Sequence, residues 1–395
     1  MLPKDWRRST IGESTKLISG NTPSKENPAF WSGDFPWVTV RDMKTPWLQE
    51  TGLTLTESGK SAASIAPANS VLVVTRGMAL LKDLPISLTM RDMAFNQDIK
   101  AMVPVDDLDA RFFAYQLQSK KHIVLDMVDT AGHGTGKLDT ILLKSVDLAL
   151  PPIREQRRIA HILSTWDQAI VTVEKLLKNS QNQKSALMCE LLSRRKEGED
   201  WKAYQLGDLF TERIEGKQDS LPLLSITRDD GIVLRDSVGR KDTSNEDKSK
   251  YLRICPGDIG YNTMRMWQGV SALSQIEGIV SPAYTIILPN EKIDARFAAY
   301  LFKLEEMIFT FYRHSQGLVS DTWNLKFEHF KKIKVRIPML AEQERAVRVL
   351  TAADDLINAH KAQIKKLRSE KTALMAQLLT GKRRVRLPAE ETSAA

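Results

Sequence analysis

The chain has 395 residues, of which 42% are hydrophobic and 27% charged, and its net charge of +8 corresponds to an isoelectric point near 9.2. This is the composition of an ordinary globular protein with two or three domains, and the positive charge favours an acidic partner, nucleic acid first of all. Two cysteines, Cys189 and Cys255, are too few for a disulfide framework or a thiolate zinc site, and no apolar run is long enough to span a bilayer. Because the N-terminus also lacks the apolar core of a signal peptide, we expect a cytoplasmic protein.

The first segment, residues 1–150, alternates strand-like runs with turn residues. Residues 70–75 are typical of a buried strand and residues 112–121 of a short amphipathic helix, which together predict an α+β domain. Loops rich in Arg, Lys, Thr and Gly separate these elements, and such side chains donate hydrogen bonds to phosphates and base edges. The alternative for any one of these residues is an ordinary solvated loop. The candidate DNA-contacting residues of this segment are Thr22, Ser24, Lys25, Arg41, Arg76, Lys82, His133 and Lys137.

The next segment, residues 151–197, is predicted to be one long helix. Pro151 ends a strand-like run at residues 146–150, and after Pro152 neither Pro nor Gly occurs until Gly198. Apolar residues then recur at alternating spacings of four and three, which is the heptad seam of a coiled coil and extends for roughly 48 Å at 1.5 Å per residue. The seam residues are Ile159, Leu163, Trp166, Ile170, Val173, Leu177, Leu187 and Leu191.

Residues 198–337 form a second globular segment that echoes the first. Both segments open on a tryptophan, Trp6 or Trp201, placed a few residues ahead of a Gly-acid pair. Residues 283–288 indicate a strand and residues 297–306 a short amphipathic helix, so a second domain of the same α+β class is expected. The candidate DNA-contacting residues of this segment are Arg228, Arg240, Lys241, Arg265 and Gln316.

The last segment, residues 338–385, repeats the long helix. Pro338 stands 187 positions after Pro151 (338 − 151), and the match continues without a gap, so that Lys371 and Lys184 occupy matching seam positions. The two heptad patterns predict an antiparallel coiled coil between the helices; the alternative is two amphipathic helices packed on their own domains. Residues 386–395 are expected to be a disordered tail. The seam of the second helix comprises Leu350, Ile357, Ile364, Leu367, Leu374 and Leu378.

No catalytic site is predicted in the chain. Residues 132–138 resemble a phosphate-binding loop, but Leu138 stands where the Walker pattern requires the Ser or Thr that binds magnesium. The triplet at residues 98–100, with Asp83 or Asp92, imitates a metal-dependent nuclease motif, but the second globular segment has no counterpart. The six histidines show no metal-ligand spacing, so no metal site is expected.

This arrangement resembles the specificity (S) subunits of type I restriction–modification enzymes. The most specific marks are two junctions in which a strand is followed by Pro-x-x-x-Glu-Gln and a helix, at residues 150–156 and 337–343. The second junction departs from the first, because Met339 replaces a proline and Ala341 a charged residue. Supporting motifs lie at residues 20–24, 35–38, 96–98 and 281–283.

The resemblance implies separate roles for the globular segments, the helices and the partner subunits. Each globular segment would be a target recognition domain reading one half of a bipartite, asymmetric DNA sequence, and the helices would fix the spacer and dock two methylation subunits. Those partners would carry S-adenosylmethionine and methylate adenine, and two restriction subunits would bring translocation and cleavage that depend on ATP and Mg. This chain itself would be non-catalytic and bind no cofactor. Two alternatives stay open: an enzyme fused to recognition domains, and a coiled-coil scaffold that never touches DNA.

Overall fold

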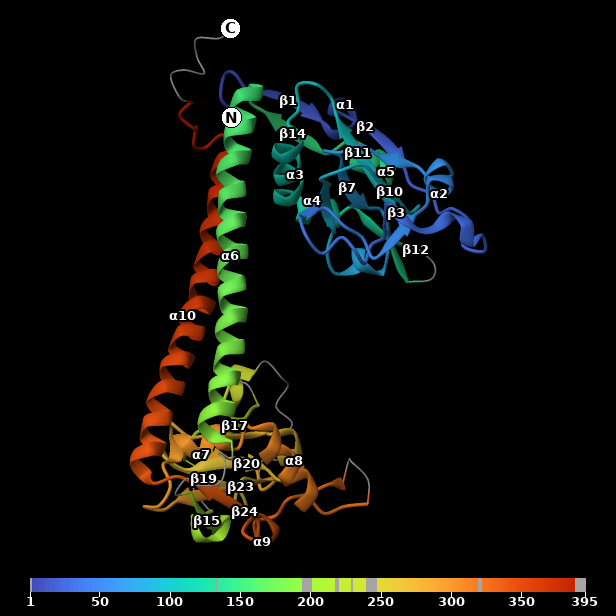
Figure 1. The fold of residues 1–395 in the computed structure, drawn as a ribbon. Helices are drawn as coiled ribbons and strands as arrows, with labels where there is room; N and C mark the ends of the chain where they lie inside the picture. Colours follow the sequence, from blue (N-terminus) through green and yellow to red (C-terminus); the bar gives the residue numbers. More distant parts are fainter. Residues whose placement is uncertain are drawn as a thin grey trace. The chain divides into compact units, whose positions relative to one another are not determined.

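The computed structural model describes residues 2–131, 134–193, 201–216, 220–228, 230–238, 247–318 and 322–387. Its contacts divide the chain into two compact units, Met1–Val173 with Gln363–Ala395 and Glu174–Ala362. Each unit contains a mixed α+β domain and parts of both long helices, α6 (Ile153–Leu192) and α10 (Leu340–Leu378) (Figure 1). The predicted fold class is confirmed. The predicted tail at 386–395 lies, from residue 388 on, outside the described residues.

The first unit is built on a five-stranded sheet of order β2-β11-β7-β9-β4. Its centre is apolar: every residue of β7 is buried, as expected for a Val-Leu-Val-Val run between two covered faces. Helix α3 (Ala110–Ser119) buries Phe112, Phe113 and Leu117, and its N-cap is Asp109, whose carboxylate accepts a hydrogen bond from the Phe112 amide. The strands are β2 (Thr15–Ser19), β11 (Ile99–Pro104), β7 (Val71–Val74), β9 (Ile86–Thr89) and β4 (Trp47–Leu48).

Besides the antiparallel pair of β1 (Arg7–Thr10) and β14 (Asp147–Leu150), two smaller sheets complete the first unit. One has the order β5-β3-β10-β6 and includes a parallel pair, β3 with β10. The other has the order β12-β13-β8. The strands are β5 (Leu53–Leu55), β3 (Trp31–Val38), β10 (Met93–Phe95), β6 (Ile65–Ala66), β12 (Val128–Ala131), β13 (Thr135–Leu138) and β8 (Arg76–Gly77).

The second unit repeats this frame around a four-stranded sheet of order β16-β23-β20-β21. Rings of Phe210, Phe302, Phe311 and Phe330 fill its core with centroids 5.4–6.2 Å apart. The single helix expected at residues 297–306 is in fact two, because the chain leaves the helix after Leu301 and a new one starts at Glu305. The elements are β16 (Phe210–Glu212), β23 (Tyr284–Pro289), β20 (Ile259–Asn262), β21 (Ser271–Leu273), α7 (Ala295–Leu301) and α8 (Glu305–His314).

The Glu-Gln pair at each junction has a structural explanation. The buried Gln156 side chain accepts a hydrogen bond from the Asp109 amide (2.9 Å) and donates to the carbonyl oxygens of Asp107 and Pro151 (both 2.9 Å). Gln343 does the same in the second unit, with the Asp294 amide and the Lys292 and Pro338 carbonyls. Each glutamine therefore fixes the start of a short domain helix to the start of a long one.

We expect Gln156→Ala to lower the free energy of unfolding by roughly 3 kcal/mol, because it leaves buried backbone groups without partners. Urea unfolding measures this effect. Gln181→Ala, in which the replaced side chain is exposed on the same helix, is the control and should change stability by less than about 0.5 kcal/mol. Equal losses in the two variants would contradict the role of the glutamine.

Glu155 connects residues from near the start of the chain with residues from near its end. It is 3% exposed, accepts a hydrogen bond from the Trp6 indole, and receives two from the Arg384 guanidinium, both 2.8 Å long. The same guanidinium binds the Asp5 carboxylate at 2.7 and 2.8 Å. Residues from near the start and near the end of the chain therefore meet at the first junction.

The two long helices pack antiparallel, as the seams predict. Within the first unit, Asp167 of α6 accepts hydrogen bonds from Lys371 Nζ of α10 (2.5 Å) and from the Tyr115 hydroxyl (2.6 Å). Within the second unit, Asp354 of α10 binds Lys184 Nζ of α6 (2.6 Å) and the Tyr300 hydroxyl (2.7 Å). We call these two groups the polar triads. They explain why both seams place a lysine at an apolar position. The predicted seam residues that are buried are Ile159, Leu163, Ile170, Val173, Leu350, Ile357, Ile364 and Leu378, and the half-buried ones are Trp166, Leu177, Leu187, Leu191, Leu367 and Leu374.

The polar triads make the stability of the fold depend on pH in the alkaline range. Burial, together with the hydrogen bond to Asp354, raises the pKa of Tyr300 to about 12. The folded chain therefore keeps this proton at a pH where the unfolded chain, with a pKa near 10, has lost it, so the stabilisation is present below pH 10 and disappears as the pH rises towards 12. We expect Tyr300→Phe to flatten the fall in unfolding midpoint between pH 10 and 12, measured by urea unfolding. An unchanged slope would contradict this assignment.

Candidate nucleic-acid interface

Several of the predicted DNA-contacting residues of the first unit lie at one end of its sheets. The loops that follow β2, β3, β7 and β10 meet there: the Asn21 amide bonds to the Phe95 carbonyl, the Asn96 amide to the Val38 carbonyl, and the Thr75 amide to the Asp98 carbonyl. The predicted residues on these loops are Thr22, Ser24, Lys25 and Arg41, and all but Thr22 are exposed. The Thr22 hydroxyl donates to Gln97 in the neighbouring loop.

Arg76 and Lys137 lie directly opposite each other on β8 and β13. Both side chains are exposed, and neither has an ion-pair partner among the residues that the structure describes. Like charges at opposed positions destabilise a sheet by up to about 1 kcal/mol, and an anion such as a phosphate beside the pair would offset that cost. Asp129 of β12 is the third residue in this row, opposite Lys137.

The expectation that Arg76 and Lys137 lie in loops is wrong, because both belong to a sheet. The strand pairing joins segments about sixty residues apart in the chain and leaves no local pattern in either. Gly136 permits it, since a Cβ there would lie 2.7 Å from the Leu80 side chain. Lys82, at the end of the short helix η2 (Met78–Leu81), is exposed beside the same sheet.

The second unit brings its predicted residues together in the same frame. The Leu325 amide bonds to the Thr263 carbonyl (2.8 Å), as the Leu138 amide bonds to the Thr75 carbonyl (2.9 Å) in the first unit. Arg265 lies just beyond Thr263 and is exposed, and Gln316 pairs with Asn324 across a β-bridge.

Arg228 is joined to this end by a lysine. Lys303 Nζ donates to the carbonyl oxygens of Arg228 (3.1 Å) and Gly269 (2.8 Å), and Gly269 directly follows the short helix η5 (Met266–Gln268) that begins after Arg265. Three of the five predicted residues of the second segment therefore gather at one end of the unit. The other two, Arg240 and Lys241, lie outside the described residues, as does His133 of the first segment.

An aromatic group at the same end of the second unit was missed by the sequence reasoning. Trp267 contacts Trp323 edge-on (5.1 Å between centroids), Trp323 contacts Tyr312 (4.8 Å), and Tyr312 lies against Phe309 (6.0 Å). We call these four residues the aromatic platform. The spacing of Phe309 and Tyr312 on one face of α8 was an available signal, but Trp267 and Trp323 join it only through the tertiary fold.

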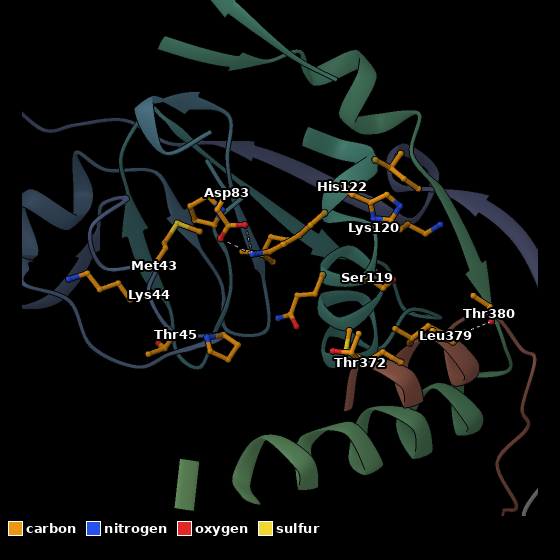
Figure 2. A pocket seen from close by; sticks show the side chains of 18 of the residues that line it. Met43, Lys44, Thr45, Asp83, Ser119, Lys120, His122, Thr372, Leu379 and Thr380 are labelled. Carbon is orange, nitrogen blue, oxygen red and sulfur yellow. Dashed lines mark hydrogen bonds and ion pairs between the residues drawn. The ribbon is translucent and has the colours of Figure 1, made fainter. Parts of the chain in front are cut away.

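A cavity of about 770 Å³ lies elsewhere in the first unit, between α4 (Lys121–Leu125), the end of α10 and residues 43–46. Figure 2 shows Lys44, Lys120 and His122 around it, and Lys121 Nζ donates to both Asp83 carboxylate oxygens at 3.0 Å. None of the predicted DNA-contacting residues lines it. The cavity is thus separate from the end of the sheets where the predicted DNA-contacting residues gather, which we call the reading end.

The structure describes no arrangement of side chains suited to metal binding. Among the described residues no group of three or more His, Cys, Asp or Glu side chains is placed to hold an ion. Asp83 pairs with Lys121, Asp92 accepts a hydrogen bond from the Ala68 amide, and Asp98 interacts with Asn96, so the triplet considered above does not assemble. Of the helices described, none has the length and apolar character needed to cross a membrane.

Two similar α+β units, each with polar loops gathered at one end and each containing parts of both long helices, define an internally duplicated protein. The family model described as "Type I restriction modification DNA specificity domain" matches residues 3–181 and 198–368. The chain belongs to this family, and it is a DNA specificity subunit of a type I restriction–modification system.

Relatives in sequence agree with this assignment, and solved structures share the fold. The specificity subunit of the type I restriction enzyme EcoR124I/EcoR124II from Escherichia coli is 31% identical over 166 residues, which is 41% of this chain and 41% of that protein. The MjaVIII specificity subunit from Methanocaldococcus jannaschii is 24% identical over 98% of this chain and 94% of its own. A crystal structure of an S subunit from M. genitalium superposes with a TM-score of 0.58 at 15% identity, covering 95% of this chain and 96% of that one. A chain from a structural study of complex assembly in the type I restriction–modification system superposes with a TM-score of 0.61 at 16% identity. The match covers 97% of this chain and 100% of that one.

Proposed function

We propose that each unit reads one half of a bipartite, asymmetric DNA target. The observation that carries this proposal is the shared frame at the reading ends, where equivalent backbone hydrogen bonds hold different side chains. Similar frames with different side chains are what reading two different half-sites requires. The segments that we assign to recognition are residues 1–150 and 198–337, and those that we assign to the helical spacer are residues 151–197 and 338–385.

Exchanging one recognition segment tests this proposal. Residues 1–150 are replaced by the matching segment of a relative with a different target, and the methylated sites of host DNA are sequenced. We expect one half-site to change while the other half-site and the spacer stay the same. A target changed in both halves, or in neither, would refute the assignment.

We propose further that the helices set the spacer, since their seam of roughly 48 Å exceeds one turn of B-DNA, about 34–36 Å. The polar triads sharpen the test. They are 17 residues apart on both helices (184 − 167 and 371 − 354), so four residues inserted near Ser180 need a matching insertion near Lys361 to keep both triads. We expect the matched pair of insertions to lengthen the tolerated spacer. An unchanged spacer in that variant would mean that the helices do not set the spacer length.

The outer faces of the helices support a docking role for two methylation subunits. Val171 and Leu176 of α6, and Val349 and Leu356 of α10, are large apolar side chains left 38–47% exposed. We expect Val349→Lys with Leu356→Lys to abolish copurification with methylation subunits. Gln181→Lys, an exposed polar position on α6, is the matched control and should leave copurification intact.

On this proposal the chemistry belongs to partners in the cytoplasm. The methylation subunits would carry S-adenosylmethionine and methylate adenine, and two restriction subunits would supply the ATP- and Mg-dependent steps. Incubating the purified chain with DNA, divalent metal, ATP and methyl donor should give no turnover, and any product would favour the enzyme alternative. A mobility shift without sequence preference, with and without a methylation subunit, would favour the scaffold alternative.

A further inference from the structure

The two reading ends differ in chemistry at equivalent positions. In the first unit, the row across the small sheet is Asp129, Lys137 and Arg76, and all three side chains are charged. In the second unit, the bridge between Gln316 and Asn324, and the bond from Leu325 to Thr263, place Gln316, Asn324 and Met264 in the corresponding row. A row of charged residues has become a row of neutral ones.

The aromatic platform lies directly beside the neutral row. Trp323 immediately precedes Asn324, and the Trp267 indole donates a hydrogen bond to the Met264 carbonyl (2.9 Å), which fixes that ring against the end of the sheet. Three members of this surface remain open to solvent: Phe309 is 59% exposed, Met264 46% and Tyr312 39%.

We propose that this surface is a binding site for the apolar edge of a DNA base, the thymine C5-methyl group in the major groove. Large apolar side chains offer no hydrogen bonds to the polar edges of bases. On a domain that reads DNA they therefore suit the apolar group that a base presents in the major groove, the C5-methyl group of thymine. Arg265 and Arg313 are exposed and lie within two residues of Trp267 and Tyr312 in the chain, and such side chains bind phosphates. The inference rests on the proposed reading function and assigns a different chemistry to each reader.

Replacing thymine by deoxyuridine tests the site, because it removes only the methyl group. With the full chain and its mapped target, we expect deoxyuridine at one or more thymines of the second half-site to weaken wild-type binding by about three- to fivefold each. The variant Phe309→Ala with Met264→Ala should bind the normal target about tenfold more weakly and lose its sensitivity to that deoxyuridine. Ile276→Ala, a 37% exposed apolar side chain beyond the opposite end of β21, is the matched control and should keep wild-type affinity and sensitivity.

The results separate this inference from the reading function on which it rests. Wild-type binding that is unchanged by deoxyuridine at every thymine of the second half-site overturns the platform, and so does a Phe309→Ala, Met264→Ala variant that stays fully sensitive. In both cases the first half-site should still be discriminated. Loss of sequence preference in both half-sites of the wild-type protein would instead reject the proposed function.

Discussion

Replacing Arg76 and Lys137 together by alanine is expected to weaken binding to the specific target by about 2–4 kcal/mol and to reduce its dependence on salt. Each phosphate contact contributes about 0.9 to the slope of log affinity against log salt, and a base contact contributes about 1–3 kcal/mol of discrimination. Fluorescence anisotropy titrations at several salt concentrations, with matched and mismatched targets, would measure both quantities.

A control with the same change in charge separates local contact from bulk attraction. Lys16 and Lys144 are exposed on the first unit, at the start of β2 and in the short helix α5 (Thr140–Lys144), away from the reading end. Their double alanine variant should keep target discrimination and lose little of the salt slope. If the two double variants behave alike, the Arg76–Lys137 pair is not a reading element.

The second large effect is expected at the polar triad of the first unit. The side chains of Asp167 and Lys371 are only 15% and 14% exposed. Removing one member of a buried ion pair leaves the charge of the other buried without a partner. Asp167→Ala should therefore cost about 3–5 kcal/mol of unfolding free energy, measured in urea. In the second unit Lys184 and Asp354 are more exposed, at 22% and 34%, so Asp354→Ala should cost distinctly less.

A compensated variant shows what the triad is for. Asp167→Leu with Lys371→Met and Tyr115→Phe replaces the polar group by apolar side chains of similar size, which can restore much or all of the stability. Restored stability together with a loosened spacer preference would show that the triad specifies helix register rather than strength, as single polar residues do in coiled coils. Restored stability with an unchanged spacer would limit its role to packing.

The features that could be predicted from the sequence are those marked by the internal repeat or by a periodic pattern of apolar residues. Pro151 and Pro338 marked both helix starts, and the heptad spacing marked the antiparallel pair, because these signals are local. Lys184 and Lys371 were recognised as seam positions, but their aspartate and tyrosine partners come from distant segments.

The reading ends were predictable only in part, for the same reason. Arg76 and Lys137, which the sequence reasoning chose as DNA-contacting residues, are exposed, yet their pairing on adjacent strands depends on long-range register. The aromatic platform escaped notice because Trp267 and Trp323 meet Phe309 and Tyr312 only after the second unit has folded. The two-helix break near Phe302 was hidden by a continuous amphipathic pattern.

The contact of Arg384 with Asp5 and Glu155 gives the molecule a closed topology. Because the segment that follows α10 is anchored beside residues near the start of the chain, the two terminal segments lie close together within the first unit, and new chain ends can be placed elsewhere. A gene in which residue 387 runs through a short linker into residue 2, with new ends beside the second domain, should yield the same fold and the same target. The order of the two domains along the gene would then not determine which DNA target the protein recognises.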